Sequence, residues 1–198
     1  PKALYGTGDW REALHLTLRQ GAPRAVQGGS VDGRPFYVAA ILGSPALWAP
    51  AREAVRERKP RLAFLYAKRA LRRAFSTRVR FKLDDGEFQR GEALALLSPL
   101  VSKAMDRPDG LEAALLDPAS AAQAIRLAAT AVIGDWRDDK AVETRVVRTA
   151  RVWSRRPIPA ILDGEPVQLD KEVAVEFLPE AFRALAPPPE ALDAHGVA

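Results

Sequence analysis

The sequence predicts an α+β domain with an antiparallel β-sandwich core and interspersed helices. Short segments of alternating apolar and polar residues recur along the 198-residue chain, Asp-Gly pairs follow several of them, and helical stretches are scattered among them. Asp-Gly between alternating segments is typical of tight hairpins, and hairpins join antiparallel strands. With 47% apolar residues, the chain can bury the core that such a sandwich needs.

The composition excludes several kinds of site. The chain has no cysteine, which excludes disulfides and thiolate metal ligands, and its two histidines, His15 and His195, are too far apart to suggest a zinc site. The longest run without charge, residues 35–51, is shorter than the roughly 20 apolar residues that span a bilayer. The net charge of +5 permits anionic partners such as phospholipid headgroups, nucleotide phosphates or nucleic acid.

Residues 1–22 are expected to form a helical segment that precedes the sandwich. Asp9, followed three positions later by a glutamate, has the residue type of a helix N-cap, and the apolar positions after it predict a helix over about residues 10–20 that Gly21 ends. The chain begins at Pro1 without an initiator methionine or a signal pattern, so we expect a fragment or a processed product.

The sandwich is predicted to occupy residues 23–187, and residues 188–198, which follow consecutive prolines, are expected to be a disordered tail. The predicted strands cover residues 26–31, 36–42, 77–83, 92–97, 111–116, 144–154, 158–162 and 167–169. The predicted helices cover residues 45–58, 61–75 and 118–134. The side chains expected to face a common core are Phe36, Val38, Ala40, Val79, Phe81, Leu94, Leu96, Val175 and Phe177.

The helix predicted over residues 61–75 has a basic face. At about 100° per residue, one sector of this helix collects five cations. They are Arg61, Lys68, Arg69, Arg72 and Arg73. Leu62 and Leu65 lie among them, a pattern suited to an anionic membrane surface, whereas a core-facing helix with a solvated basic face would show the same cations.

The order of these elements and of four acidic turns resembles the C-terminal domain of the bacterial diacylglycerol kinase-like lipid kinases, the family that also holds sphingosine kinases. The turns are Asp32-Gly33, Asp85-Gly86-Glu87, Asp109-Gly110 and Asp163-Gly164-Glu165. Two elements depart from the family pattern. Asp9 stands where the family has the asparagine of a Gly-Thr-x-Asn element, and residues 98–103 replace a glycine-rich loop.

The resemblance implies a lipid kinase that uses ATP and Mg²⁺ and transfers the γ-phosphoryl group to a lipid hydroxyl. In that interpretation Asp163 is the candidate general base, and Glu165 is its metal or nucleotide-side partner. Asp109 matches an acidic family position that supports metal binding. The implied partners are the lipid substrate, an anionic membrane and the protein's own nucleotide-binding half, with a homodimer as a further possibility.

The family's nucleotide-binding half carries a Gly-Gly-Asp-Gly type of loop, and none occurs in these 198 residues. We therefore expect the chain alone to be inactive, and the intact protein to be a cytoplasmic enzyme peripheral to the inner membrane face.

Two other functions compete with the kinase interpretation. One is a non-catalytic β-sandwich that binds anionic membranes through the helix at 61–75. The other is nucleic-acid binding, which the sequence favours less because aromatic residues do not alternate with the cations of that helix as a stacking platform requires.

Overall fold

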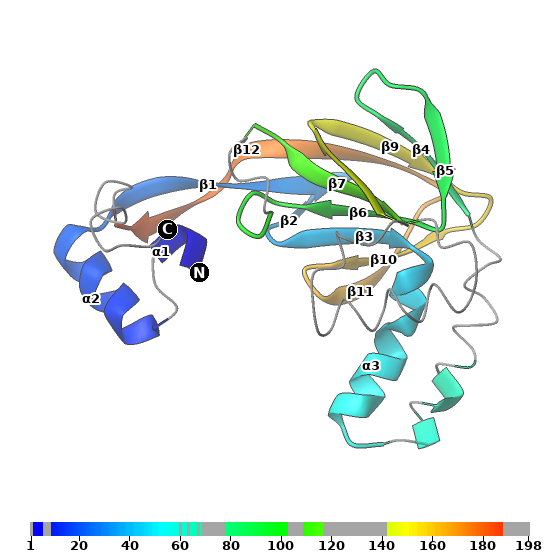
Figure 1. Ribbon diagram of the computed structural model, residues 1–198, viewed down its shortest axis with the longest axis horizontal. Coiled ribbons are helices and arrows are strands. Elements are labelled where there is room, and N and C mark those ends of the chain that lie inside the picture. The colour runs from blue at the N-terminus through cyan, green and yellow to red at the C-terminus, as the bar shows by residue number, and fades with distance from the viewer. Residues whose placement is uncertain are drawn as a thin grey trace.

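The computed structural model shows two antiparallel six-stranded sheets packed face to face (Figure 1). The structure describes residues 2–5, 9–59, 61–62, 64–66, 68, 78–102, 109–116 and 142–187. The predicted antiparallel β-sandwich is confirmed, and the described part of the chain is mostly β structure with few helices.

Each sheet is built from strands that are distant in the sequence. Sheet A has the order β2-β1-β12-β9-β4-β5, with bounds β1 Ala22–Val31, β2 Arg34–Phe36, β4 Val79–Leu83, β5 Phe88–Gly91, β9 Thr149–Trp153 and β12 Glu172–Ala186. Sheet B has the order β11-β10-β3-β6-β7-β8, with bounds β3 Ala39–Gly43, β6 Ala93–Leu97, β7 Leu111–Leu116, β8 Val142–Val147, β10 Ile158–Leu162 and β11 Glu165–Leu169.

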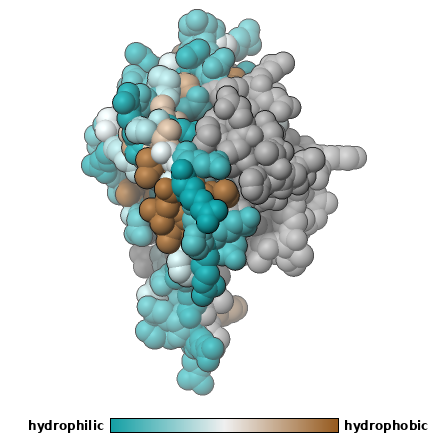
Figure 2. All heavy atoms as spheres, turned by 90° about the vertical axis from the view of Figure 1, so that its left-hand side faces the viewer, coloured by the Kyte–Doolittle hydropathy of each residue, from teal (hydrophilic) through white to brown (hydrophobic). Residues whose placement is uncertain are grey.

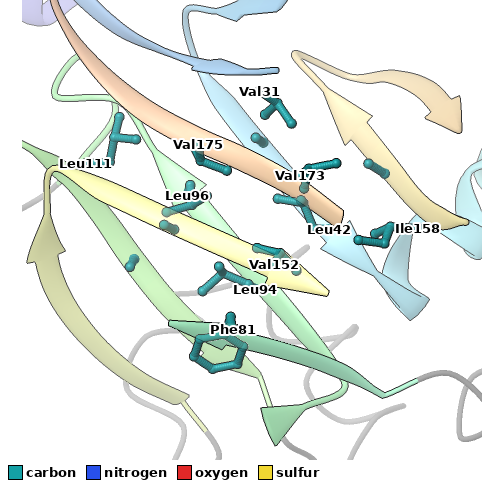
Figure 3. Close-up of a cluster of buried hydrophobic side chains, with 14 of the residues drawn as sticks. Val31, Leu42, Phe81, Leu94, Leu96, Leu111, Val152, Ile158, Val173 and Val175 are labelled. Carbon is teal, nitrogen blue, oxygen red and sulfur yellow. The ribbon is translucent and has the colours of Figure 1, made fainter. Parts of the chain in front are cut away.

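The core lies between the inner faces of the two sheets. Figure 3 shows aliphatic side chains and one phenylalanine from both sheets pointing toward one another, and every labelled residue is almost fully buried. The labelled residues are Val31, Phe81, Val152, Val173 and Val175 of sheet A, and Leu42, Leu94, Leu96, Leu111 and Ile158 of sheet B. The predicted core residues are confirmed except Val38, whose side chain is 46% exposed.

Val38 is exposed because the strand predicted over residues 36–42 is not continuous. Its first part, β2, belongs to sheet A and its second part, β3, belongs to sheet B, so residues 37–38 carry the chain from one sheet to the other. The strand predicted over residues 144–154 divides in the same way, because β8 lies in sheet B, β9 lies in sheet A, and Arg148 joins them. The segment between the strands predicted at 77–83 and 92–97 contains a further strand, β5, after the turn at Asp85-Gly86-Glu87.

Helix α2 (Trp10–Gln20) begins and ends at its predicted caps. It begins after Asp9, whose side chain accepts a 2.8 Å hydrogen bond from the Arg11 N–H, and it ends at Gly21. Helix α1 (Lys2–Tyr5) precedes it. The 3₁₀ helix η1 (Ser44–Trp48) and α3 (Ala49–Arg56) cover most of the predicted helix at 45–58. The helix predicted at 118–134 and the tail at 188–198 lie outside the described residues.

A two-stranded arm extends from the sandwich toward α2 (Figure 1). The strands β1 and β12 pair along their whole shared length, from Val31 opposite Val175 to Ala22 opposite Ala186. The other neighbour of β1 pairs only with residues 29–31, and the other neighbour of β12 pairs only with residues 172–176, so the rest of the pair forms the arm. Within the part of the chain that is described, no helix is long and apolar enough to cross a membrane.

Candidate functional site

The Asp163-Gly164 turn forms the two-residue hairpin that the sequence predicts. Leu162 at the end of β10 pairs with Glu165 at the start of β11. Asp163 has φ +50° and Gly164 has φ +96°, so both turn residues adopt the left-handed conformation that a type I′ turn requires. Glycine adopts this conformation without steric cost, and aspartate is one of the few other residues that tolerate it.

The Asp163 carboxylate binds the segment that crosses between the sheets. Its Oδ2 atom accepts a 2.7 Å hydrogen bond from the Tyr37 N–H, and its Oδ1 atom accepts hydrogen bonds from the N–H groups of Val38 and Ala39, at 2.7 and 3.0 Å. The Asp163 N–H donates in return to the Ala39 carbonyl at 2.9 Å. One aspartate therefore fixes three consecutive backbone N–H groups.

Ser98 fixes the same segment through its carbonyl groups. The fully buried Ser98 donates from its hydroxyl to the Tyr37 carbonyl at 2.6 Å, and its backbone N–H donates to the Val38 carbonyl at 2.9 Å. Sequence reasoning identified the loop beginning at Ser98 as a departure from the family, but it gave Ser98 no role. A polar residue directly after the apolar strand β6 was the only signal that could have indicated one.

The hydrogen bonds continue across the end of sheet B. The Ser102 N–H donates to the Ser98 carbonyl at 3.0 Å, and the Ser102 hydroxyl donates to the buried Glu112 carboxylate of β7 at 2.6 Å. The hairpin at Asp163, the crossing segment and the loop at 98–102 thus form one connected structure at a single end of the sheet.

Asp109 lies at this end too, but it is not close to Asp163. It precedes β7, and the strands β3 and β6 separate β7 from β10. Three inter-strand spacings amount to at least roughly 14 Å, which is too far for two carboxylates to hold one ion directly. Among the described residues no group of three histidine, cysteine, aspartate or glutamate side chains could hold a metal.

Hydrogen bonds hold the carboxylate of Asp163 in place, but not that of Glu165. Its side chain is exposed, and it makes no hydrogen bond or ion pair within the described part of the chain.

Of the five cations predicted on the basic helix, Arg61 and Lys68 are exposed at helical positions, whereas Arg69, Arg72 and Arg73 lie outside the described residues.

Two other aspartates repeat the geometry of Asp163. Asp32 (φ +47°) accepts the Ala174 N–H at 2.7 Å beside Gly33, and Asp84 (φ +47°) accepts the N–H groups of Arg148 and Thr149 at 2.9 and 2.8 Å. In the second Asp-Gly-Glu triplet, the residue that corresponds to Asp163 is therefore Asp84 rather than Asp85.

Comparison with known proteins identifies the fold. No protein-family model and no curated protein matches the sequence. Three solved diacylglycerol kinases of Bacillus anthracis str. Sterne, two of them described as putative, each cover 96% of this chain at 11–13% identity, with TM-scores of 0.59, 0.57 and 0.59. The chain spans 63%, 65% and 66% of the length of these structures. At such identities the likeness shows the fold, so the chain has the fold of the corresponding part of these diacylglycerol kinases.

Proposed function

We propose that this chain is the lipid-side part of a kinase that transfers the γ-phosphoryl group of ATP to the hydroxyl of a diacylglycerol-like lipid. The observation that carries the proposal is the Asp163-Gly164-Glu165 hairpin. It holds one carboxylate fixed and one free at the same turn, in a fold shared with diacylglycerol kinases.

Asp163 is proposed as the general base for the acceptor hydroxyl. A carboxylate offers about four lone-pair positions. Three of them are taken by the N–H groups of Tyr37, Val38 and Ala39, and only one of these three is on Oδ2. Because Asp163 is exposed, one position on Oδ2 is left for a substrate hydroxyl, and the backbone hydrogen bonds keep this oxygen in a fixed orientation, as proton transfer requires.

Glu165 is proposed as the partner on the metal or nucleotide side. Its exposed carboxylate has no competing hydrogen bond in the described chain, so it is available to a ligand that approaches the turn from outside. The described residues alone do not fit a magnesium site, because they contain no cluster of acidic side chains and Asp109 is distant from the hairpin. We therefore propose that another part of the intact protein supplies the phosphate-binding groups and most of the metal ligands.

The kinase proposal is tested with the intact protein, ATP, Mg²⁺ and diacylglycerol in mixed micelles. Asp163→Asn should lower kcat by about 10²–10⁴-fold, the usual range for loss of a general base. Asp32→Asn and Asp85→Asn serve as controls from other Asp-Gly turns and should change kcat little. Glu165→Gln should lower kcat without destabilising the protein, because this side chain is exposed and makes no described contact. Equal losses at residues 163 and 32 would contradict the assignment.

A second candidate function, membrane binding through the basic helix, is favoured by the exposed residues near it. Phe64 and Leu65 are 69% and 58% exposed beside the exposed Arg61 and Lys68. We expect vesicles with anionic lipid to retain the protein, and charge reversal at Arg69, Arg72 and Arg73 to weaken retention, more strongly at low salt where the screening length is longer. Equal retention by neutral and anionic vesicles would contradict membrane binding and favour the alternative, a helix whose basic face is only solvated.

A further inference from the structure

The outer face of sheet A carries cations and aromatic rings that the proposed kinase reaction does not use. On β4, Val79, Phe81 and Leu83 point into the core. The residues between them, Arg80 and Lys82, therefore point outward, because successive side chains of a strand alternate between its two faces.

The neighbouring strands add to this surface. The register places Arg80 opposite Arg90 of β5 and Trp153 of β9, and it places Lys82 opposite Phe88 of β5 and Arg151 of β9. These outward positions of three adjacent strands define the basic sheet face, which consists of Arg80, Lys82, Phe88, Arg90, Arg151 and Trp153.

None of the four cations of the basic sheet face forms an ion pair with a described residue. Acidic side chains lie at its borders, because Asp85 and Glu87 are in the turn between β4 and β5, and Glu172 and Glu176 lie on β12 on either side of Ala174, the residue opposite Arg151. Like charges directly opposite each other on neighbouring strands destabilise a sheet. The cations of the basic sheet face therefore repel one another, and the positive potential that they create attracts an anionic partner.

The aromatic residues indicate which anion fits. Phe88 is 62% exposed, its ring centroid lies 5.4 Å from that of Trp153, and the Arg80 guanidinium lies 5.8 Å from the Phe88 centroid. Exposed aromatic rings among cations are typical of protein surfaces at the membrane–water interface. Nucleic acid fits less well, because Arg80 and Trp153 already occupy part of the ring surface on which a base would stack.

We propose that the basic sheet face binds the surface of anionic phospholipid membranes. Phe88 enters the headgroup region, while Arg80, Lys82, Arg90 and Arg151 contact lipid phosphates. This membrane contact is separate from the basic helix at 61–75, and it does not depend on the proposed kinase activity.

The test is sedimentation of the 198-residue chain with phosphatidylcholine vesicles that contain or lack phosphatidylglycerol. The triple variant R80Q/R90Q/R151Q should bind the anionic vesicles about 100-fold more weakly, given the usual contribution of each surface cation. The triple variant R11Q/R19Q/R34Q removes the same charge from exposed positions elsewhere and should bind almost as well as the original chain. Phe88→Ala should weaken binding about tenfold with no change in charge.

Thermal unfolding distinguishes this functional role from a structural one. Because R80Q/R90Q/R151Q removes opposed like charges, its Tm should rise while its membrane binding falls. Equal losses of binding in the two triple variants would overturn the proposal, since net charge alone would then explain binding. Tighter binding to a single-stranded oligonucleotide than to anionic vesicles, lost in R80Q/R90Q/R151Q, would also overturn it and assign the face to nucleic acid.

Discussion

At the scale of single residues, Asp32, Asp84 and Asp163 show how one residue type can fix both a turn and the strand beside it. Each adopts a positive φ, and each accepts at least one backbone N–H from a neighbouring strand segment. The sequence predicted the turns at Asp32 and Asp163 from the Asp-Gly pairs, because the turn chemistry is local. It could not predict the side-chain hydrogen bonds, because their partners lie 64 to 142 residues away.

Asp163→Asn should destabilise the fold more than the same change at the other two turns. Asp163 uses both carboxylate oxygens, whereas Asp32 and Asp84 use only Oδ1. Asparagine keeps one acceptor oxygen but replaces the other with a donor, which at position 163 would face a backbone N–H. We expect the free energy of unfolding to fall by about 1–3 kcal/mol for Asp163→Asn and by under about 1 kcal/mol for Asp32→Asn.

Urea unfolding followed by circular dichroism measures these differences. Asp84→Asn is the second control, because the N–H groups of Arg148 and Thr149 both donate to the same atom of Asp84, Oδ1. If Asp163→Asn proved as mild as both controls, the hydrogen bond from the Tyr37 N–H to Oδ2 would not contribute to stability.

At the scale of elements, the sequence predicted most strands but not where the chain changes sheets. Residues 36, 40 and 42 all reach the core, so the alternation across the break at 37–38 looks continuous in the sequence. At the second crossing a signal was present, because Val147 and Ala150 both reach the core although they are three positions apart. Such a spacing does not fit one regular strand, in which inward positions are separated by even numbers of residues.

Helix α2 lies on the surface of the described structure. None of its residues is buried, and Leu14 and Leu18, one turn apart, are 49% and 72% exposed. Figure 2 faces this end of the molecule and shows apolar surface beside hydrophilic surface. We propose that this apolar side packs against the nucleotide-binding half of the intact protein, and the exposed Leu14 and Leu18 support that proposal.

Without that half, we expect the chain to self-associate through the exposed side of α2. An apolar surface of this kind favours association with a second copy when its usual partner is absent. Leu14→Gln with Leu18→Gln should lower the molar mass measured by light scattering toward that of a monomer, whereas Arg19→Gln, next to this row on the same helix, should not. A monomer at high concentration for the original chain would contradict this expectation.

At the scale of the whole molecule, the described residues around the Asp163 hairpin do not form a metal site by themselves. The hairpin, the crossing segment and the loop at 98–102 are joined at one end of sheet B, but no described cluster of acids holds a metal there. The solved structures with this fold are longer, since the chain spans only 63–66% of their length. The resemblance predicts that the active site is divided between two parts, because the residues contain no Gly-Gly-Asp-Gly loop, and this division stays a prediction.

The 198-residue chain alone should therefore not turn over ATP. Phosphoryl transfer depends mainly on the positioning and electrostatic stabilisation of the phosphates, and the loop that would bind them is absent from this sequence. Fused to a nucleotide-binding lobe from a diacylglycerol kinase of the same fold, it should phosphorylate diacylglycerol in the presence of Mg²⁺. The measurement is phosphatidic acid formed from labelled ATP, with the fused Glu165→Gln variant as the control for contaminating kinases. Turnover by the chain alone that Glu165→Gln abolishes would show that these residues contain a complete active site, and would contradict the division into two parts.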